Sequence, residues 1–134
     1  MLTTYRRDGS ALVSPVWFRV NDQAFEMVVA AGDLKLAHLR RDPRCVLLVF
    51  EAVPPFRGVT VRGRATLVPD DGSRTRLAMA SRYLGPEDGR RYADPARRPP
   101  GVVVRLPVSD ARAWDLSASL PPANRADDSA PGAC

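Results

Sequence analysis

The only lysine of the chain stands in a segment whose residue types suit phosphate binding. Lys35 falls in AGDLKLAHLRRDPR, residues 31–44, whereas every other basic residue is an arginine. Asp33 is a plausible N-cap for a short helix, which Asp42-Pro43 would end. An ammonium group in the first turn adds a point charge to the free N–H groups of a helix N-terminus, and phosphate fits there. Lys35 is therefore either a phosphate ligand or a solvated lysine on an amphipathic helix.

Few other side chains offer catalytic chemistry. His38 is the only histidine and lies in the middle of the same predicted helix, so we expect a surface or interface residue rather than a metal ligand or a general base. Cys45 and Cys134 show neither metal-ligand nor disulfide spacing, and we expect both to be inert. The sequence contains no GxSxG and no GxxxxGK motif. No metal site is expected, and an enzyme built on this chain would need a cofactor.

Composition and charge narrow the possible partners. The chain has 134 residues, 45% of them hydrophobic and 26% charged, which is typical of one globular domain. Its net charge of +5 favours anionic partners, but the arginines are spread along the sequence, so we expect no nucleic acid. No apolar run approaches the roughly 18 to 20 residues that cross a bilayer, and no signal peptide is evident. We therefore expect a cytoplasmic protein without a membrane partner.

Most of the chain has the pattern of short antiparallel strands. Asp8-Gly9 and Asn21-Asp22 suit hairpin turns, so residues 1–30 are predicted to form three strands. Pro15 cannot donate to a strand ladder, so pairing should be interrupted there, which leaves nearby backbone groups free for a ligand. Further strands are predicted at residues 45–50, 58–68, 101–106 and 111–116. Helices are predicted at residues 34–41, 74–84 and 86–92.

Five or six of these strands would be linked mostly by hairpins, and with two or three short inserted helices they predict a mainly β protein, a six-stranded antiparallel barrel. Residues 1–116 would form this domain. Residues 117–134 change to Ala, Pro, Ser and Asp without periodicity, and are predicted to be a disordered tail. Residues 45–50, CVLLVF, are apolar on both faces, which predicts a central strand covered on two sides, with a second subunit as a possible cover.

The order of several short motifs resembles a known family. LTTYRRDGS, SPVWF, KLAHLRRDPR, VRGRATLV and RAWD follow one another as in the pyridoxamine 5'-phosphate oxidase-like split β-barrels, specifically the branch that uses the deazaflavin coenzyme F-420. The resemblance covers roughly residues 1–116. Its most specific parts are SPVWF, residues 14–18, and KLAHLRRDPR, residues 35–44.

The resemblance implies an FMN-binding split-barrel fold and a homodimer with two cofactor sites at the subunit interface. The strand matching residues 13–17 would run along the flavin or deazaflavin ring. Residues 32–35 would bind the cofactor phosphate through Lys35, and the strand near residues 57–60 and the partner subunit's Trp114 would add contacts. The implied cofactor-binding residues are Val13, Ser14, Pro15, Val16, Trp17, Gly32, Asp33, Leu34, Lys35, Val59 and Trp114.

The activity implied is a reductase that transfers hydride from reduced F-420 to a small unsaturated acceptor. Trp17 either helps to wall the pocket or belongs to the barrel or interface core. One alternative is FMN in the same pocket of an oxidase or reductase of the pyridoxamine 5'-phosphate oxidase type; another is a non-catalytic module that binds a flavin-type cofactor. The poly-glutamate tail of F-420 would need a basic exit groove, for which Arg40, Arg41 and Arg44 are candidates. Acceptor specificity would rest on the loops at residues 52–57 and 86–100.

Overall fold

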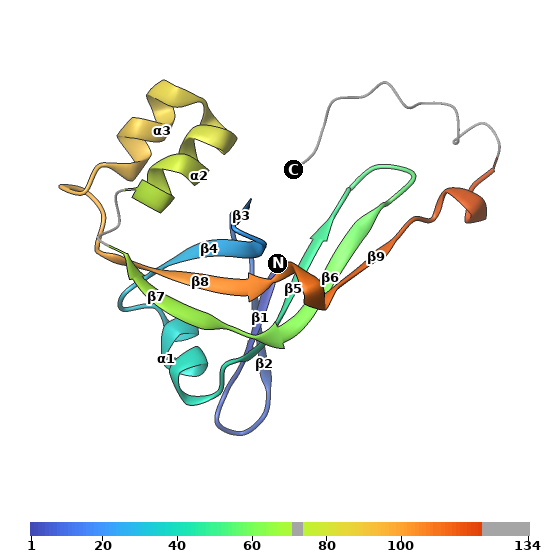
Figure 1. The fold of residues 1–134 in the computed structure, drawn as a ribbon, viewed down its shortest axis with the longest axis horizontal. Helices are drawn as coiled ribbons and strands as arrows, with labels where there is room; N and C mark the ends of the chain where they lie inside the picture. Colours follow the sequence, from blue (N-terminus) through green and yellow to red (C-terminus); the bar gives the residue numbers. More distant parts are fainter. Residues whose placement is uncertain (71–73, 122–134) are drawn as a thin grey trace.

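The computed structural model describes residues 1–70 and 74–121, which fold mainly into β-strands with a few short helices (Figure 1). The strands are β1 (Leu2–Tyr5), β2 (Ala11–Ser14), β3 (Arg19–Asn21), β4 (Ala24–Ala30), β5 (Arg44–Phe50), β6 (Gly58–Arg64), β7 (Thr66–Asp70), β8 (Gly101–Pro107) and β9 (Ala111–Trp114). The α-helices are α1 (Leu34–Arg41), α2 (Arg74–Leu84) and α3 (Pro86–Ala93), and 3-10 helices cover Val108–Asp110 and Ser117–Ser119.

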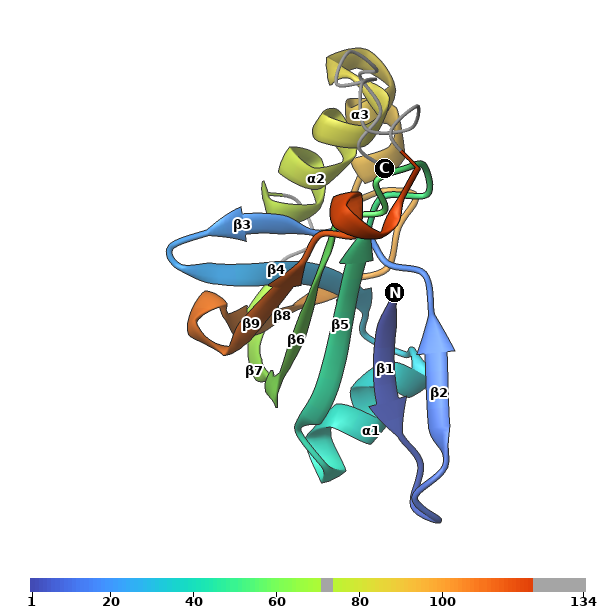
Figure 2. The same ribbon diagram turned by 90° about the vertical axis from the view of Figure 1, so that its right-hand side faces the viewer.

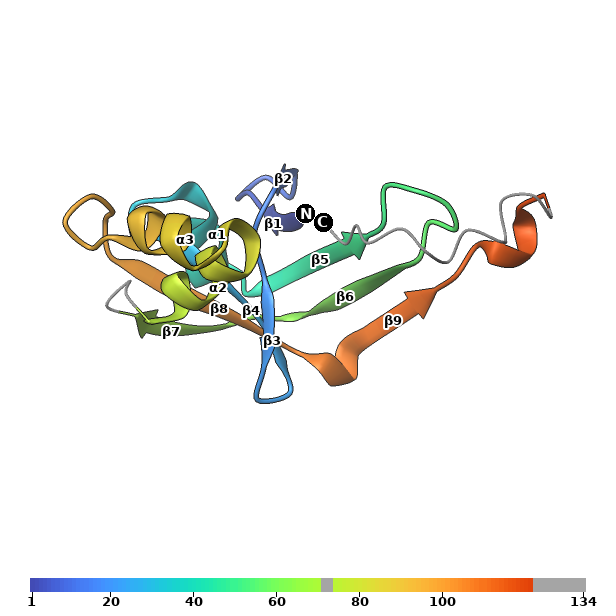
Figure 3. The same cartoon turned by 90° about the horizontal axis from the view of Figure 1, so that it is seen from above.

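Two antiparallel sheets enclose the core. One sheet has the strand order β2-β1-β5-β6-β9, and the other has the order β3-β4-β8-β7. Helices α2 and α3 pack against each other, while α1 contacts β1 and β4 on another side of the barrel (Figure 2). The β5–β6 hairpin and β9 extend away from α2 and α3 (Figure 3). The predicted mainly β, antiparallel architecture with short inserted helices is confirmed.

The predicted number of strands, six, is wrong, because the described residues hold nine. Residues 11–20 form β2 and β3 in different sheets, with the break starting at Pro15, where the missing N–H group ends the ladder. Residues 58–68 likewise divide into β6 and β7 at Ala65, whose N–H group bonds to the carbonyl of Pro43. At both breaks the chain passes from one sheet to the other, and an alternating apolar pattern does not reveal such corners.

The predicted helices are confirmed, and local signals explain their limits. Asp33 caps α1 by accepting a hydrogen bond from the backbone N–H of Lys35, and the helix ends before Asp42-Pro43. Gly85 lies between α2 and α3 with a φ angle of 84°, in the left-handed region that glycine adopts freely. Pro86 then occupies the start of α3, where its missing N–H group costs no helical hydrogen bond.

The core lies between the two sheets and beneath α1. Strand β4 pairs with β8 from Ala24↔Pro107 to Ala30↔Gly101, which makes this pair the backbone of the second sheet. In the first sheet, β5 lies between β1 and β6, so the apolar strand is central, as predicted. The buried cluster consists of Leu2, Phe25, Met27, Val29, Leu36, Leu39, Cys45, Leu47, Val61, Val102, Val104 and Leu106.

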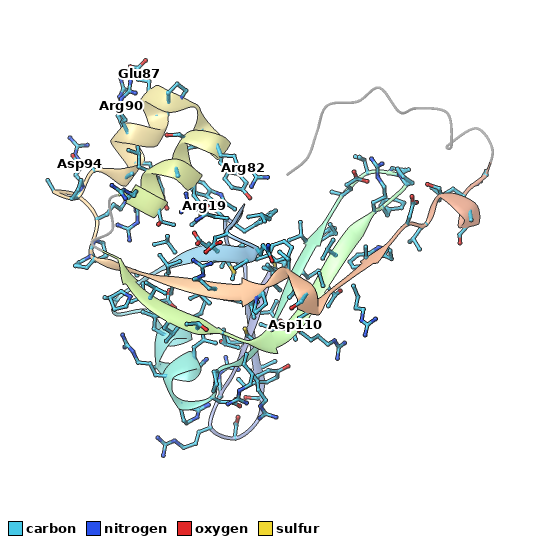
Figure 4. The ribbon with its side chains drawn as sticks, viewed as in Figure 1. Arg19, Arg82, Glu87, Arg90, Asp94 and Asp110 are labelled. Carbon is cyan, nitrogen blue, oxygen red and sulfur yellow. The ribbon has the colours of Figure 1, made fainter. Side chains whose placement is uncertain are left out.

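A buried ion-pair network holds the second sheet under α2. Glu26 of β4 is 2% exposed, and its carboxylate accepts hydrogen bonds from Arg19 Nε and Arg105 Nη1, both at 2.9 Å. These residues are direct cross-strand neighbours, since Arg19 pairs with Glu26 and Glu26 with Arg105. Figure 4 shows Arg19 between the sheet and α2. Two guanidinium groups compensate the buried carboxylate, and the sequence pattern gave no sign of this network.

Two expectations about potentially reactive side chains have different outcomes. His38 was expected at a surface or interface, but in this chain it is 8% exposed and its Nδ1 lies 3.0 Å from Thr4 Oγ1, because α1 packs against β1. Cys45 is buried, and burial raises the pKa of its thiol to about 11, so the reactive thiolate is scarce at neutral pH. Cys134 lies outside the described residues.

The predicted tail begins with the 3-10 helix Ser117–Ser119, and residues 122–134 lie outside the described part of the chain. The domain boundary at residue 116 and the disorder of the tail stay predictions. None of the helices in the described residues is both long enough and apolar enough to cross a membrane.

Truncating the centre of β5 should destabilise the fold. Leu47 is fully buried, so Leu47→Ala is expected to lower the free energy of unfolding by about 2–5 kcal/mol. The matched control is Leu34→Ala, because Leu34 is 68% exposed and its truncation should change the free energy of unfolding by no more than about 0.5 kcal/mol. Urea denaturation followed by circular dichroism measures both. Equal effects would contradict the placement of Leu47 in the core.

Candidate functional site

Lys35 lies beside a cavity of about 350 Å³ at the junction of four chain segments. The segments are the break between β2 and β3, the end of β4, the first turn of α1, and the α2–α3 pair. The cavity is lined by Pro15, Val16, Trp17, Val28, Val29, Ala30, Asp33, Lys35, Arg76, Met79 and Tyr92. Five of the predicted cofactor-binding residues therefore meet at one place, namely Pro15, Val16, Trp17, Asp33 and Lys35.

Asp33 and Lys35 form an ion pair at the N-terminus of α1. One carboxylate oxygen of Asp33 accepts a hydrogen bond from the backbone N–H of Lys35 and the other from its Nζ, each at 2.9 Å. Burial disfavours the charged carboxylate, but the hydrogen bonds and positive charge of Lys35 outweigh it and hold the pKa of Asp33 below its ordinary value. The carboxylate is thus turned into the cap, and it compensates much of the lysine charge.

The cavity is lined by a second cation, Arg76, which the sequence analysis did not predict as a site residue. Arg76 of α2 is 8% exposed, and its Nη1 donates a hydrogen bond of 2.9 Å to the carbonyl of Pro99. Because Asp33 already pairs with Lys35, Arg76 gives the cavity a net positive charge. The available signal was helical spacing, since Arg76 lies three and four residues before the buried Met79 and Ala80.

Aromatic rings from α2 and α3 pack against Trp17. The ring of Trp17 stacks on that of Tyr83 with centroids 5.1 Å apart, and the ring of Tyr92 lies 4.9 Å from it at a tilt of 45°. Trp17 therefore lines the cavity wall and does not belong to the buried core cluster. Arg82 of α2, labelled in Figure 4, donates a hydrogen bond to the carbonyl of Phe18 and so ties the helix to the same segment.

The break between β2 and β3 leaves polar groups free. The backbone N–H groups of Val16 and Trp17 form no hydrogen bond to another described residue. The hydroxyl of Ser14 is buried, also without a partner among the described residues. A second, largely apolar cavity of about 520 Å³ lies against the same break and is also lined by Leu47–Phe50 of β5. The predicted interruption at Pro15 thus places free donors between two cavities.

The remaining predicted residues do not line the lysine cavity in this chain. Val59 and Trp114 line a separate cavity of about 500 Å³ near the β5–β6 hairpin, where Trp114 Nε1 donates a hydrogen bond to the carbonyl of Phe56. Val13 is 52% exposed on β2, and Gly32 and Leu34 are exposed at the start of α1. A contribution of the partner subunit's Trp114 to the lysine cavity stays a prediction.

The donor set suits an anionic group next to a flat apolar one. Lys35 and Arg76 are cations, the break at residues 15–17 offers N–H donors, and the walls are aromatic or aliphatic. Among the described residues, no group of three or more His, Cys, Asp or Glu side chains is arranged so that it could hold a metal ion.

The pairing of Asp33 with Lys35 predicts a pH dependence. Because the folded-state pKa of Asp33 is depressed, its contribution to stability is complete above the ordinary aspartate pKa and is lost as pH falls through the depressed value. Carbon-detected NMR of the side-chain carboxyl should give a midpoint below the ordinary value of 3.8. Lys35→Met should move this midpoint upward, and an unchanged midpoint would contradict the pairing.

Comparison with known proteins identifies the fold. The chain resembles the conserved hypothetical protein Rv2991 from Mycobacterium tuberculosis, with 27% identity and a TM-score of 0.70 over 90% of this chain and 79% of that one. It also resembles a structure described as an F-420 reductase, with 24% identity and a TM-score of 0.65 over 83% of this chain and 86% of that one.

A FAD-binding protein from Mesorhizobium loti has the same fold, with 22% identity and a TM-score of 0.59 over 85% of this chain and 81% of that one. No curated protein matches the chain. Residues 1–115 match the family described as Pyridoxamine 5'-phosphate oxidase, which covers the barrel and its inserted helices. The chain belongs to the pyridoxamine 5'-phosphate oxidase family and has its mainly β split-barrel fold.

Proposed function

We propose that this protein is an oxidoreductase that uses the deazaflavin F-420 and reduces a small unsaturated acceptor. The observation that carries the proposal is the meeting of Lys35, Arg76 and the free N–H groups of Val16 and Trp17 at one cavity. The likeness to a structure described as an F-420 reductase supports the choice of cofactor. The sequence resemblance in SPVWF and KLAHLRRDPR points the same way.

The residues of this chain would hold the cofactor rather than perform chemistry of their own. Lys35 and Arg76 would bind its phosphate, since both cations line the cavity. The N–H groups of Val16 and Trp17 and the hydroxyl of Ser14 are unpaired donors suited to the polar edge of a ring system. Trp17 and Tyr83 would exclude water from the reacting face. When bound, the deazaflavin supplies hydride transfer.

FMN is the second candidate cofactor, because the same cations and apolar walls suit its phosphate and ring. The fold shared with a FAD-binding protein supports a flavin in this family's pocket. The poly-glutamate tail of F-420 would distinguish the two cofactors. Of the predicted exit residues, Arg41 and Arg44 line a groove at the far end of α1, and Arg40 is exposed on the helix. If the protein binds either cofactor but catalyses no reaction, it would be a non-catalytic module that binds a flavin-type cofactor.

A homodimer is part of the proposal. Exposed apolar side chains gather where the β5–β6 hairpin and the segment after β9 extend from the barrel (Figure 3), with Phe50, Val53, Phe56 and Leu116 between 38% and 52% exposed. A second subunit would cover these groups and remove their apolar surface from water. It would also bring its own Trp114 near the cofactor cavity, as the resemblance implies.

Removing the lysine should weaken cofactor binding. Lys35→Ala is expected to raise the dissociation constant for F-420 at least tenfold, about 1.4 kcal/mol, because a phosphate contact is lost. Fluorescence titration against F-420 and FMN in parallel measures this effect, with Arg112→Ala as the control, because Arg112 is an exposed cation that does not line the lysine cavity. Tighter binding of FMN than of F-420 would move the protein to the flavin branch. No binding of either cofactor by folded protein would overturn the proposal.

Charge placed in the hairpin should dissociate the dimer. Val53→Asp puts a carboxylate into the proposed apolar contact, so the protein is expected to become monomeric at micromolar concentration. Light scattering after size-exclusion chromatography measures the mass. Val68→Asp is the matched control, because Val68 is 41% exposed on β7 of the other sheet. A monomeric wild-type protein, or dissociation by both variants alike, would contradict this interface.

A further inference from the structure

Arginines that are scattered along the sequence gather at one end of the first sheet. The β1–β2 turn, the end of α1 and the start of β5 lie together there (Figures 1 and 2), next to the end of β6. They surround a groove of about 680 Å³. Among the described residues, six arginines line it, namely Arg6, Arg7, Arg41, Arg44, Arg62 and Arg64.

The positive charge of this arginine groove is largely uncompensated. Within the described residues its only lining carboxylate is Asp42, which Arg44 binds through two nitrogens at 2.7 to 3.2 Å. These hydrogen bonds lower the pKa of Asp42 to about 2, so the pair is ionised at neutral pH. No ion pair or hydrogen bond to another described residue engages the side chains of Arg7, Arg62 and Arg64.

The strand register places like charges next to each other. Arg44 on β5 is directly opposite Arg64 on β6, and Arg62 follows two residues along the same face. Neighbouring strands lie about 4.8 Å apart, and like charges directly opposite one another destabilise a sheet. An anion with several charges between these side chains would turn the repulsion into attraction. Guanidinium groups match the geometry of phosphate oxygens in paired hydrogen bonds.

The arginine groove is separate from the lysine cavity. The two cavities share no lining residue, and Lys35 and Arg41 lie at opposite ends of α1, about 9 Å apart along the helix axis. The groove is also remote from the proposed dimer contact. Strand β5 runs from Arg44 at the groove to Phe50 at the apolar hairpin, roughly 20 Å away.

We propose that the arginine groove is a second binding site, for a small ligand that carries adjacent phosphate groups. The volume lies within the range of about 300–1,000 Å³ typical of small-molecule sites. Tyr5, whose ring centroid is 5.9 Å from the guanidinium of Arg44, offers an aromatic surface for a nucleoside attached to the phosphates.

Isothermal titration with inorganic tripolyphosphate at fixed salt tests this site in the full chain. The double variant Arg62→Ser/Arg64→Ser should bind at least tenfold more weakly than the wild type. Both residues are exposed and unpaired, so the midpoint temperature of thermal unfolding of the double variant should be unchanged or slightly higher than that of the wild type. Lys35→Ala and Arg112→Ser, which removes an exposed arginine of β9 outside the groove, should change the affinity less than twofold.

Titration with ATP distinguishes two sources of the same chemistry. Tighter binding of ATP than of tripolyphosphate, reduced by Tyr5→Leu, supports a nucleotide ligand, and equal affinity supports a phosphate chain alone. The proposal is overturned if tripolyphosphate does not bind, or if Arg112→Ser weakens it as much as the double variant does. It is also overturned if a single-stranded oligonucleotide binds the groove at least tenfold more tightly, which would indicate a polymer site.

The cofactor proposal and this one fail in different ways. Loss of tripolyphosphate binding in Lys35→Ala, with the double variant unaffected, would place the phosphate ligand in the lysine cavity and overturn the second site. Loss of F-420 binding in the double variant, with tripolyphosphate binding unchanged, would make the groove part of the cofactor site and likewise overturn it. Failure of F-420 to bind the wild type would leave the groove proposal standing.

Discussion

The interruption of the strand ladder at Pro15 is the constraint on which the candidate site depends. Without an N–H group at this position the chain leaves one sheet and enters the other, and residues 15–18 between β2 and β3 pair with neither. The same departure frees the N–H groups of Val16 and Trp17 and brings Trp17 against the helices. A regular strand would have satisfied these groups internally and closed the space on both sides.

The electrostatics of the two basic regions differ in kind. At the lysine cavity a carboxylate is built into the helix cap, so Lys35 is held in one orientation, and Arg76 supplies the excess charge. The arginine groove is lined by six arginines and by a single carboxylate among the described residues. The first arrangement holds its cation in place before a ligand binds, whereas in the second the proposed anion would relieve the repulsion between like charges.

Local features could be predicted from the sequence, and contacts between distant segments could not. The N-cap at Asp33, the break at Pro15 and the helix limits depend on neighbouring residues, so propensity and turn chemistry identified them. Arg76 joins Lys35 only because α2 folds over the end of β4. The arginines of the β1–β2 turn, α1, β5 and β6 converge only because the sheet brings these segments together. His38 was misplaced for the same reason, because its burial depends on β1 packing against α1.

Gly58 and Trp114 join the β5–β6 hairpin and β9 into one arm that extends from the barrel. The indole ring occupies the space in which a Cβ atom at residue 58 would lie, and its Nε1 is bonded to the carbonyl of Phe56. The hairpin and β9 are therefore locked together rather than left as two independent loops. A flexible arm would lose conformational entropy when it binds another surface. In this arm that entropy is already lost during folding, so association would occur between preformed surfaces.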